Sequence, residues 1–128
     1  MRSYHNNVVW ITGASSGIGE ALAHEFANKG AMLVLAARNV EKLNALKATL
    51  PNAEVHLVLS LDLTNLSDVA AKVDSVISQF GRVDVLVNNG GISQRSTVGE
   101  TPVDVDRKIM EVNFFGAVGL TKALLPHL

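Results

Sequence analysis

The sequence predicts an α/β fold built on a doubly wound parallel sheet. Three observations predict it: short apolar runs alternate with helical patterns along all 128 residues, the helical patterns repeat apolar residues every three or four positions, and glycine or proline marks the junctions. Strands that alternate with helices in this way are typical of βαβ units. Right-handed crossovers then predict a Rossmann-type sheet with strand order 3-2-1-4 and a crevice between strands 1 and 4.

Four strands are expected, each a short run rich in Val, Leu, Ile or Ala, as strands covered on both faces require. They cover residues 8–12, 32–37, 54–60 and 83–88. Four helices are expected over about 17–28, 40–50, 66–80 and 102–126. The first shows its period clearly, because Ile18, Leu22 and Phe26 stand four positions apart. Gly30 and Gly81 follow the first and third helices, where a left-handed residue commonly ends a helix.

Composition excludes several classes of function. The formal net charge is −1 with no long run of one sign, so no nucleic-acid or anionic-membrane partner is indicated. The absence of cysteine excludes disulfides, thiolate metal sites and cysteine nucleophiles. No apolar stretch reaches the roughly eighteen residues of a membrane span. A single cytoplasmic domain over residues 1–128 is therefore the expectation.

A glycine-rich turn, residues 12–19, joins the first strand to the first helix. Its spacing, Gly13-x3-Gly17-x-Gly19, matches neither the G-x-G-x-x-G fingerprint nor a P-loop. A helix N-terminus left open by glycines presents unpaired N–H groups and a partial positive charge, and a phosphate binds there without any side chain. The turn predicts a nucleotide pyrophosphate site, although the same glycines could serve only a tight strand-to-helix connection.

Arg38 follows the second strand, where dinucleotide-binding folds meet the adenosine ribose. A carboxylate at this point binds the free 2′-hydroxyl of NAD, whereas an arginine accommodates the 2′-phosphate of NADP. Ala37 and Arg38 stand where the acid would be expected, so the sequence favours NADP. The alternative is a solvent-exposed arginine with no partner.

Two more strand ends are expected at the same crevice. Asp62, after the third strand, could accept a hydrogen bond from an adenine amino group, or could be an acid favoured by the dipole of the next helix. The segment Asn88-Asn89-Gly90-Gly91, after the fourth strand, suits the close approach of a flat ligand or a simple turn.

Together these segments resemble the short-chain dehydrogenase/reductase superfamily, in the same order and spacing over the whole chain. The matching motifs are residues 12–19 (TGxxxGxG), Asp62, residues 88–91 (NNAG, with Gly90 replacing alanine) and Val112-Asn113. The resemblance implies hydride transfer between NADP(H) and a small-molecule carbonyl or alcohol. It implies that Asn113 is a catalytic residue that anchors a water in a proton relay. It also implies cofactor contacts from Gly13, Ser15, Ser16, Gly17, Ile18, Gly19, Arg38, Asp62, Leu63, Asn88 and Gly90.

The family's chemistry also needs a serine and a Tyr-x-x-x-Lys pair, and this chain has no such pair. Its one tyrosine is Tyr4, and the residue four places on is Val8. The chain is therefore expected to be the NADP-binding half of a longer oxidoreductase and to be inactive alone. A non-catalytic NADP-binding or interaction module, complete at this length, is the alternative, and a segment taken from a longer polypeptide is a third possibility.

Two further expectations concern partners and metals. The fourth strand is expected to be an exposed sheet edge, which pairs readily with other chains. The final helix is apolar on nearly every side around Phe114-Phe115, and in the family this helix helps form a subunit interface, so a homo-oligomer is expected. His24-Glu25 resembles the start of H-E-x-x-H, but Asn28 stands at the last position, so no metal site is expected.

Overall fold

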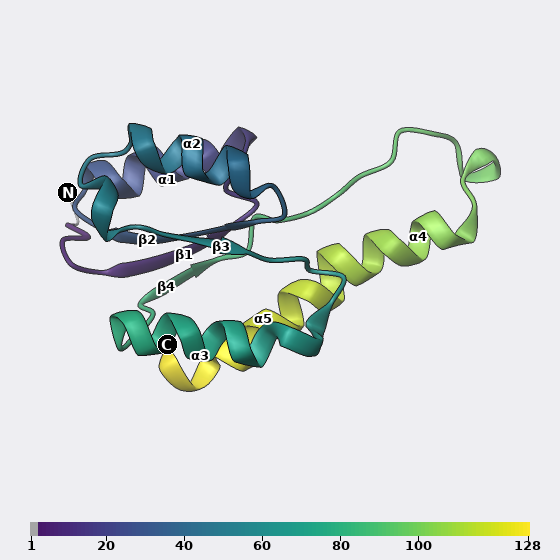
Figure 1. Cartoon of the computed structure of the whole chain (residues 1–128). Helices are drawn as coiled ribbons and strands as arrows, with labels where there is room; N and C mark the ends of the chain where they lie inside the picture. The colour runs from purple at the N-terminus through teal and green to yellow at the C-terminus, as the bar shows by residue number, and fades with distance from the viewer. Residues whose placement is uncertain (1–2) are drawn as a thin grey trace.

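A four-stranded parallel sheet lies at the centre of the computed structural model, which describes residues 3–128 (Figure 1). The strand order is β3-β2-β1-β4 and every pairing is parallel, which confirms the predicted order 3-2-1-4. The strands are β1 (Val8–Thr12), β2 (Met32–Ala37), β3 (Leu57–Ser60) and β4 (Val85–Val87).

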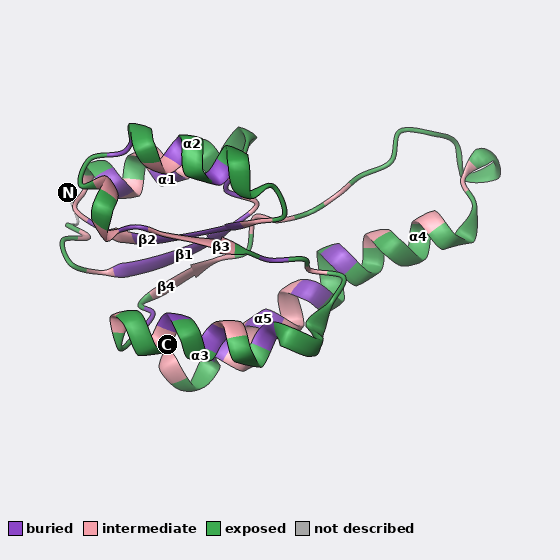
Figure 2. Ribbon diagram, viewed as in Figure 1, coloured by how far each residue is buried: buried purple, intermediate pink, exposed green. Residues whose placement is uncertain are grey.

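Helices cover both faces of the sheet, as a doubly wound fold requires (Figure 1). Two lie on one face, α1 (Gly17–Asn28) and α2 (Val40–Thr49), and two on the other, α3 (Val69–Phe80) and α5 (Ala117–Leu124). A further helix, α4 (Val103–Met110), extends away from the sheet and is mostly exposed (Figure 2). Within residues 3–128, no helix combines the length and the apolar character that a membrane crossing requires.

The core has two halves, one on each face of the sheet. Successive side chains of a strand point to opposite faces, so Val8 and Trp10 pack toward α3 and α5, while Val9 and Ile11 pack toward α1 and α2. All four side chains are fully buried. This two-sided burial explains why the strands are continuous apolar runs.

Two predicted strands are shorter than expected. The segment 54–60 begins instead with a single 3-10 turn, Ala53–Val55, because Asn52 adopts a left-handed conformation with φ of 54°. Pairing with β2 therefore starts only at Leu57. At the end of β4 the chain turns at once, since the N–H of Asn89 donates to the carbonyl of Val87, so residue 88 is not part of the strand.

The expected helix over 102–126 is interrupted. A π-helical turn, Glu111–Gly116, separates α4 from α5, and a 3-10 turn, Leu125–His127, follows α5. At Gly116 an added Cβ would lie 2.8 Å from the carbonyl oxygen of Leu63, so the helix packs closely on the loop after β3. Single π turns of this kind occur frequently at functional sites.

A buried histidine joins the far end of the sheet to the α2–β3 connection. His56 is 2% exposed, its Nδ1 accepts a hydrogen bond from the N–H of Leu33 (3.1 Å), and its Nε2 donates to the carbonyl of Pro51 (2.9 Å). Because Nδ1 accepts, the ring is neutral in the folded protein. Burial lowers the pKa of His56, and the bond to Pro51 opposes that shift only in part.

We expect this histidine to make the fold sensitive to mild acid. A lowered folded-state pKa means that the unfolded chain binds the proton first, so the free energy of unfolding falls as pH drops below about 6.5. Urea unfolding of the wild type should show this loss between about pH 7 and pH 5, well above the range where carboxylates titrate. The variant His56→Gln should be less stable at neutral pH and lose this slope, whereas His24→Gln on α1 should keep it. An equal slope in wild type and His56→Gln would contradict the assignment.

Candidate functional site

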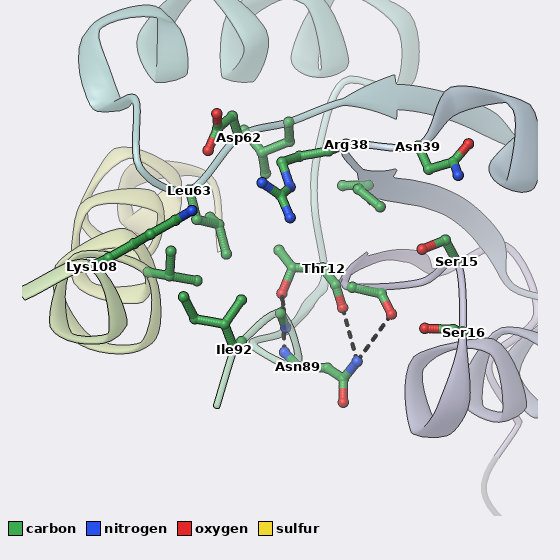
Figure 3. A pocket seen from close by; sticks show the side chains of 17 residues that line it. Thr12, Ser15, Ser16, Arg38, Asn39, Asp62, Leu63, Asn89, Ile92 and Lys108 are labelled. Atoms are coloured by element: carbon green, nitrogen blue, oxygen red, sulfur yellow. Dashed lines mark hydrogen bonds between the residues drawn. The ribbon is translucent and has the colours of Figure 1, made fainter. Parts of the chain in front are cut away.

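The carboxyl ends of the strands open into one pocket of about 330 Å³ (Figure 3). The β1–α1 turn contributes Gly13, Ser15 and Ser16 to its wall. The other walls come from the ends of β2 and β3 and from the segment after β4. The last wall comes from α4 and the π turn that follows it. The pocket therefore lies at the predicted crevice beyond the ends of strands 1 and 4.

The glycines of the β1–α1 turn permit very close packing. Gly13 has a φ of +64°, and a Cβ there would lie 2.9 Å from the Cα of Gly90. A Cβ on Gly19 would overlap the carbonyl oxygen of Gly13 and lie 2.6 Å from Nδ2 of Asn89. Ser16 precedes α1 and, in the described part of the chain, makes no capping bond with its side chain. The first N–H groups of α1 are thus arranged as a phosphate site requires.

The structure brings most of the predicted cofactor residues together. Those that line the pocket are Gly13, Ser15, Ser16, Arg38, Asp62, Leu63 and Gly90. Gly17 and Ile18 begin α1 outside the pocket wall, and the Ile18 side chain is 73% exposed. Asn88 is exposed and donates from its side chain to Oγ1 of Thr121 on α5 (3.1 Å), so it faces away from the pocket. Cofactor contacts by all of these residues, and by Gly19, stay predictions.

Thr12 and Asn89 hold the two loops of the site against each other. Oγ1 of Thr12 accepts from the N–H groups of Asn89 (3.0 Å) and Gly90 (2.8 Å) and donates to the carbonyl of Val87 (3.3 Å). Nδ2 of Asn89 donates to the carbonyls of Thr12 and Gly13, at 3.2 Å each. Both residues line the pocket, and Figure 3 shows the bonds that join Thr12 and Gly13 to Asn89 and Gly90.

Asp62 is ionised and partly engaged in its own loop. Its Oδ1 accepts from Oγ1 of Thr64 (2.7 Å) and from the N–H of Thr64 (2.9 Å). These bonds, first from the side chain and then from the backbone, lower the pKa of Asp62, and the positive charges of Arg38 and Lys108 lower it further. Asn65, rather than Asp62, caps the 3-10 turn Leu66–Asp68 that leads into α3, so Asp62 lies ahead of the helix start.

Asn113 sits in the π turn and binds the segment that follows β4. Its Oδ1 accepts from the N–H of Ile92 and its Nδ2 donates to the carbonyl of Ile92, both at 2.8 Å. This pair of hydrogen bonds holds the helix against the pocket wall, because Ile92 lines the pocket. The catalytic role expected for Asn113 stays a prediction.

Sequence patterns missed several pocket residues. Asn39 lines the pocket and also caps α2 by accepting from the N–H of Lys42. Lys108 and Val112 line it from the helical segment that also contains Asn113. Their spacing of four residues was the available signal, since it places them on one helix face near Asn113. In the described ranges, no group of three His, Asp or Glu side chains could hold a metal ion.

Comparison with known proteins agrees with this geometry. The family model for short chain dehydrogenase matches residues 7–128. The chain is 50% identical over 126 residues to Dehydrogenase/reductase SDR family member 7 from Homo sapiens, which covers 94% of this chain and 37% of that protein. It is 47% identical over 135 residues to Dehydrogenase/reductase SDR family protein 7-like from Anopheles gambiae, across 99% of this chain and 42% of that protein. The chain thus spans less than half the length of the curated relatives it matches.

Among the structural neighbours, one solved structure contains an NADP derivative and another contains NADH. One is an alcohol dehydrogenase from Thermococcus sibiricus in complex with 5-hydroxy-NADP (TM-score 0.89, 35% identity, 95% of this chain and 53% of that one). The other is a 3-ketoacyl-(acyl-carrier-protein) reductase from Brucella melitensis in complex with NADH (TM-score 0.88, 36% identity, 98% of this chain and 51% of that one). The neighbours alone therefore do not decide between the two cofactors.

Proposed function

This chain belongs to the short-chain dehydrogenase family, and from that premise we propose that it is the NADP-binding part of an oxidoreductase. The parent protein would transfer hydride between NADP(H) and a small-molecule carbonyl or alcohol. The observation that carries the choice of NADP is Arg38, which lines the pocket at the tip of β2 where an NAD-binding domain would hold an acid. Among residues 3–128, none of the ion pairs in the structure includes Arg38, so its charge is available to a phosphate.

The pocket residues fit a dinucleotide. The glycine turn packs directly against Asn89 and Gly90, and the N-terminus of α1 suits the pyrophosphate. Asp62 is ionised, so it can accept from the adenine amino group beside the apolar side chain of Leu63. Bound NADPH supplies a hydride. A proton donor must come from elsewhere, because the sequence contains no Tyr-x-x-x-Lys.

A fluorescence titration tests this proposal. Trp10 is the only tryptophan, is fully buried, and lies on β1 two residues before Thr12, so energy transfer from Trp10 to the reduced nicotinamide would report binding. We expect NADPH to bind about ten- to a hundredfold more tightly than NADH, as one charge-assisted contact to the 2′-phosphate would give. Equal affinities would contradict the choice of NADP, and no binding of either cofactor would contradict the cofactor-binding role. Measurable turnover by the pure chain would contradict its inactivity.

A non-catalytic NADP-binding module is the second candidate. The two candidates differ in the coding sequence after Leu128. A reading frame that continues into a serine and a Tyr-x-x-x-Lys would support the parent enzyme. A stop codon directly after Leu128 in the native gene would support the module.

We also propose that the chain self-associates. Met110, Phe114 and Phe115 are about half exposed on the helix beyond the sheet, and β4 is an edge strand. Apolar side chains grouped in this way mark interaction surfaces. Sedimentation at tens of micromolar should show a species larger than the monomer, and Phe114→Glu should shift it toward the monomer. A strictly monomeric wild type would overturn this proposal.

A further inference from the structure

Lys108 enters the pocket from a different wall than Arg38 (Figure 3). It projects from α4, and Val112 lies four residues further along the same helix, on the same face. Val112 is 8% exposed and Lys108 is exposed, so the helix presents an apolar surface and a cation side by side. Arg38, by contrast, reaches in from the end of β2.

The ammonium of Lys108 has no ion pair among the described residues. The acid that lines the pocket with it is Asp62, whose Oδ1 is already engaged by Thr64. Figure 3 shows Asp62, Lys108 and Arg38 at one end of the pocket. The positive charges of both Lys108 and Arg38 lower the pKa of Asp62. Two cations and one carboxylate leave this end positively charged overall.

The chemistry at this end matches an adenine base. Leu63 and Val112 line it with apolar surface, which a flat ring covers well. Asp62 only accepts hydrogen bonds and Lys108 only donates them. Adenine offers the complementary pair, since its amino group donates and an adjacent ring nitrogen accepts. Arg38 lies where the ribose 2′-phosphate is expected, so the two cations would serve different parts of one ligand.

We propose that Lys108 is a binding residue for the adenine base of the cofactor. Its ammonium donates to a ring nitrogen of adenine, while Asp62 accepts from the amino group. The inference rests on the proposed function. Because the base is common to NADP and NAD, Lys108 adds affinity for both cofactors equally, in contrast to Arg38.

Binding by Lys108→Met tests this role. We expect the dissociation constants of NADPH and NADH to rise by the same factor, about three- to tenfold, as one charge-assisted bond from an exposed side chain supplies. The inhibition constant of adenosine, which has no phosphate, should rise by the same factor in the variant. Lys108→Arg should restore most of the affinity. Arg107→Met, which removes the same charge from the neighbouring position outside the pocket, should bind as the wild type does.

The experiment distinguishes a contact of Lys108 with adenine from a contact with the 2′-phosphate or the pyrophosphate. A loss confined to NADPH would place Lys108 at the 2′-phosphate and overturn the inference. A wild-type inhibition constant for adenosine, with both cofactors weakened, would place Lys108 at the pyrophosphate and also overturn it. Wild-type affinities in Lys108→Met would overturn this inference alone. A wild type that binds neither cofactor would overturn the proposed function together with it.

Discussion

Replacing Gly19 by alanine is expected to abolish cofactor binding and to lower the free energy of unfolding by about 2–3 kcal/mol. The added Cβ would overlap the carbonyl oxygen of Gly13 and lie 2.6 Å from Nδ2 of Asn89. Neither neighbour can move freely, because Asn89 Nδ2 is bonded to the carbonyls of both Thr12 and Gly13. The turn must therefore open, and the phosphate site opens with it. The gain in helix propensity from glycine to alanine, about 1 kcal/mol, is smaller than this cost.

Urea unfolding followed by Trp10 fluorescence, together with NADPH titration, would measure both effects. The matched control is Gly99→Ala, because a Cβ at Gly99 meets nothing within 4 Å. That control should keep its stability within about 0.5 kcal/mol and bind NADPH normally. If Gly19→Ala unfolded and bound as the wild type does, the close packing of the turn would not matter to the site.

Replacing Arg38 by aspartate is expected to reverse the cofactor preference. The change removes an attraction to the 2′-phosphate and puts a carboxylate beside it, so NADPH should bind at least about a hundredfold more weakly. The same carboxylate can accept from the free 2′-hydroxyl of NADH, so NADH should bind as well as before or better. Arg38 is exposed at the end of β2, and the stability of the fold should change little.

Paired titrations with NADPH and NADH would measure this reversal. Arg107→Asp makes the same charge change on α4, outside the pocket, and should leave the preference for NADPH intact. Arg38→Lys should keep part of the preference, since it keeps the charge but not the planar donor pair. An unchanged ratio of the two affinities in Arg38→Asp would show that Arg38 has no part in cofactor choice.

The sequence alone predicted those site residues that closely follow a strand. Gly13, Arg38 and Asp62 each follow a strand, and the carboxyl ends of parallel strands meet at one edge of the sheet. These three residues could be identified without long-range information. Asn88 follows a strand as well, but its amide turns toward Thr121 on α5, and no spacing in the sequence indicates that direction.

The remaining features depend on contacts between segments far apart in the chain. The π turn was missed because helical periodicity continues through it, whereas its packing depends on the close approach of Gly116 to Leu63. The bonds from Asn113 to Ile92 join segments that are 21 residues apart. No motif in the sequence distinguished Lys108 from the other charged residues of its helix, because its place in the pocket depends on how that helix packs beside the loop after β3.

The sequence by itself determined the α/β class, the strand order and the position of the pocket, because apolar period, glycine spacing and crossover handedness are properties of short segments. Only the tertiary structure decided which side chains enter that pocket. It brought Lys108 and Val112 to the wall, turned Asn88 away, and joined Thr12 to Asn89 and Gly90. The physical reason is that a side chain's direction is set by packing and hydrogen bonds from other elements, and these form only once the whole sheet and its helices are assembled.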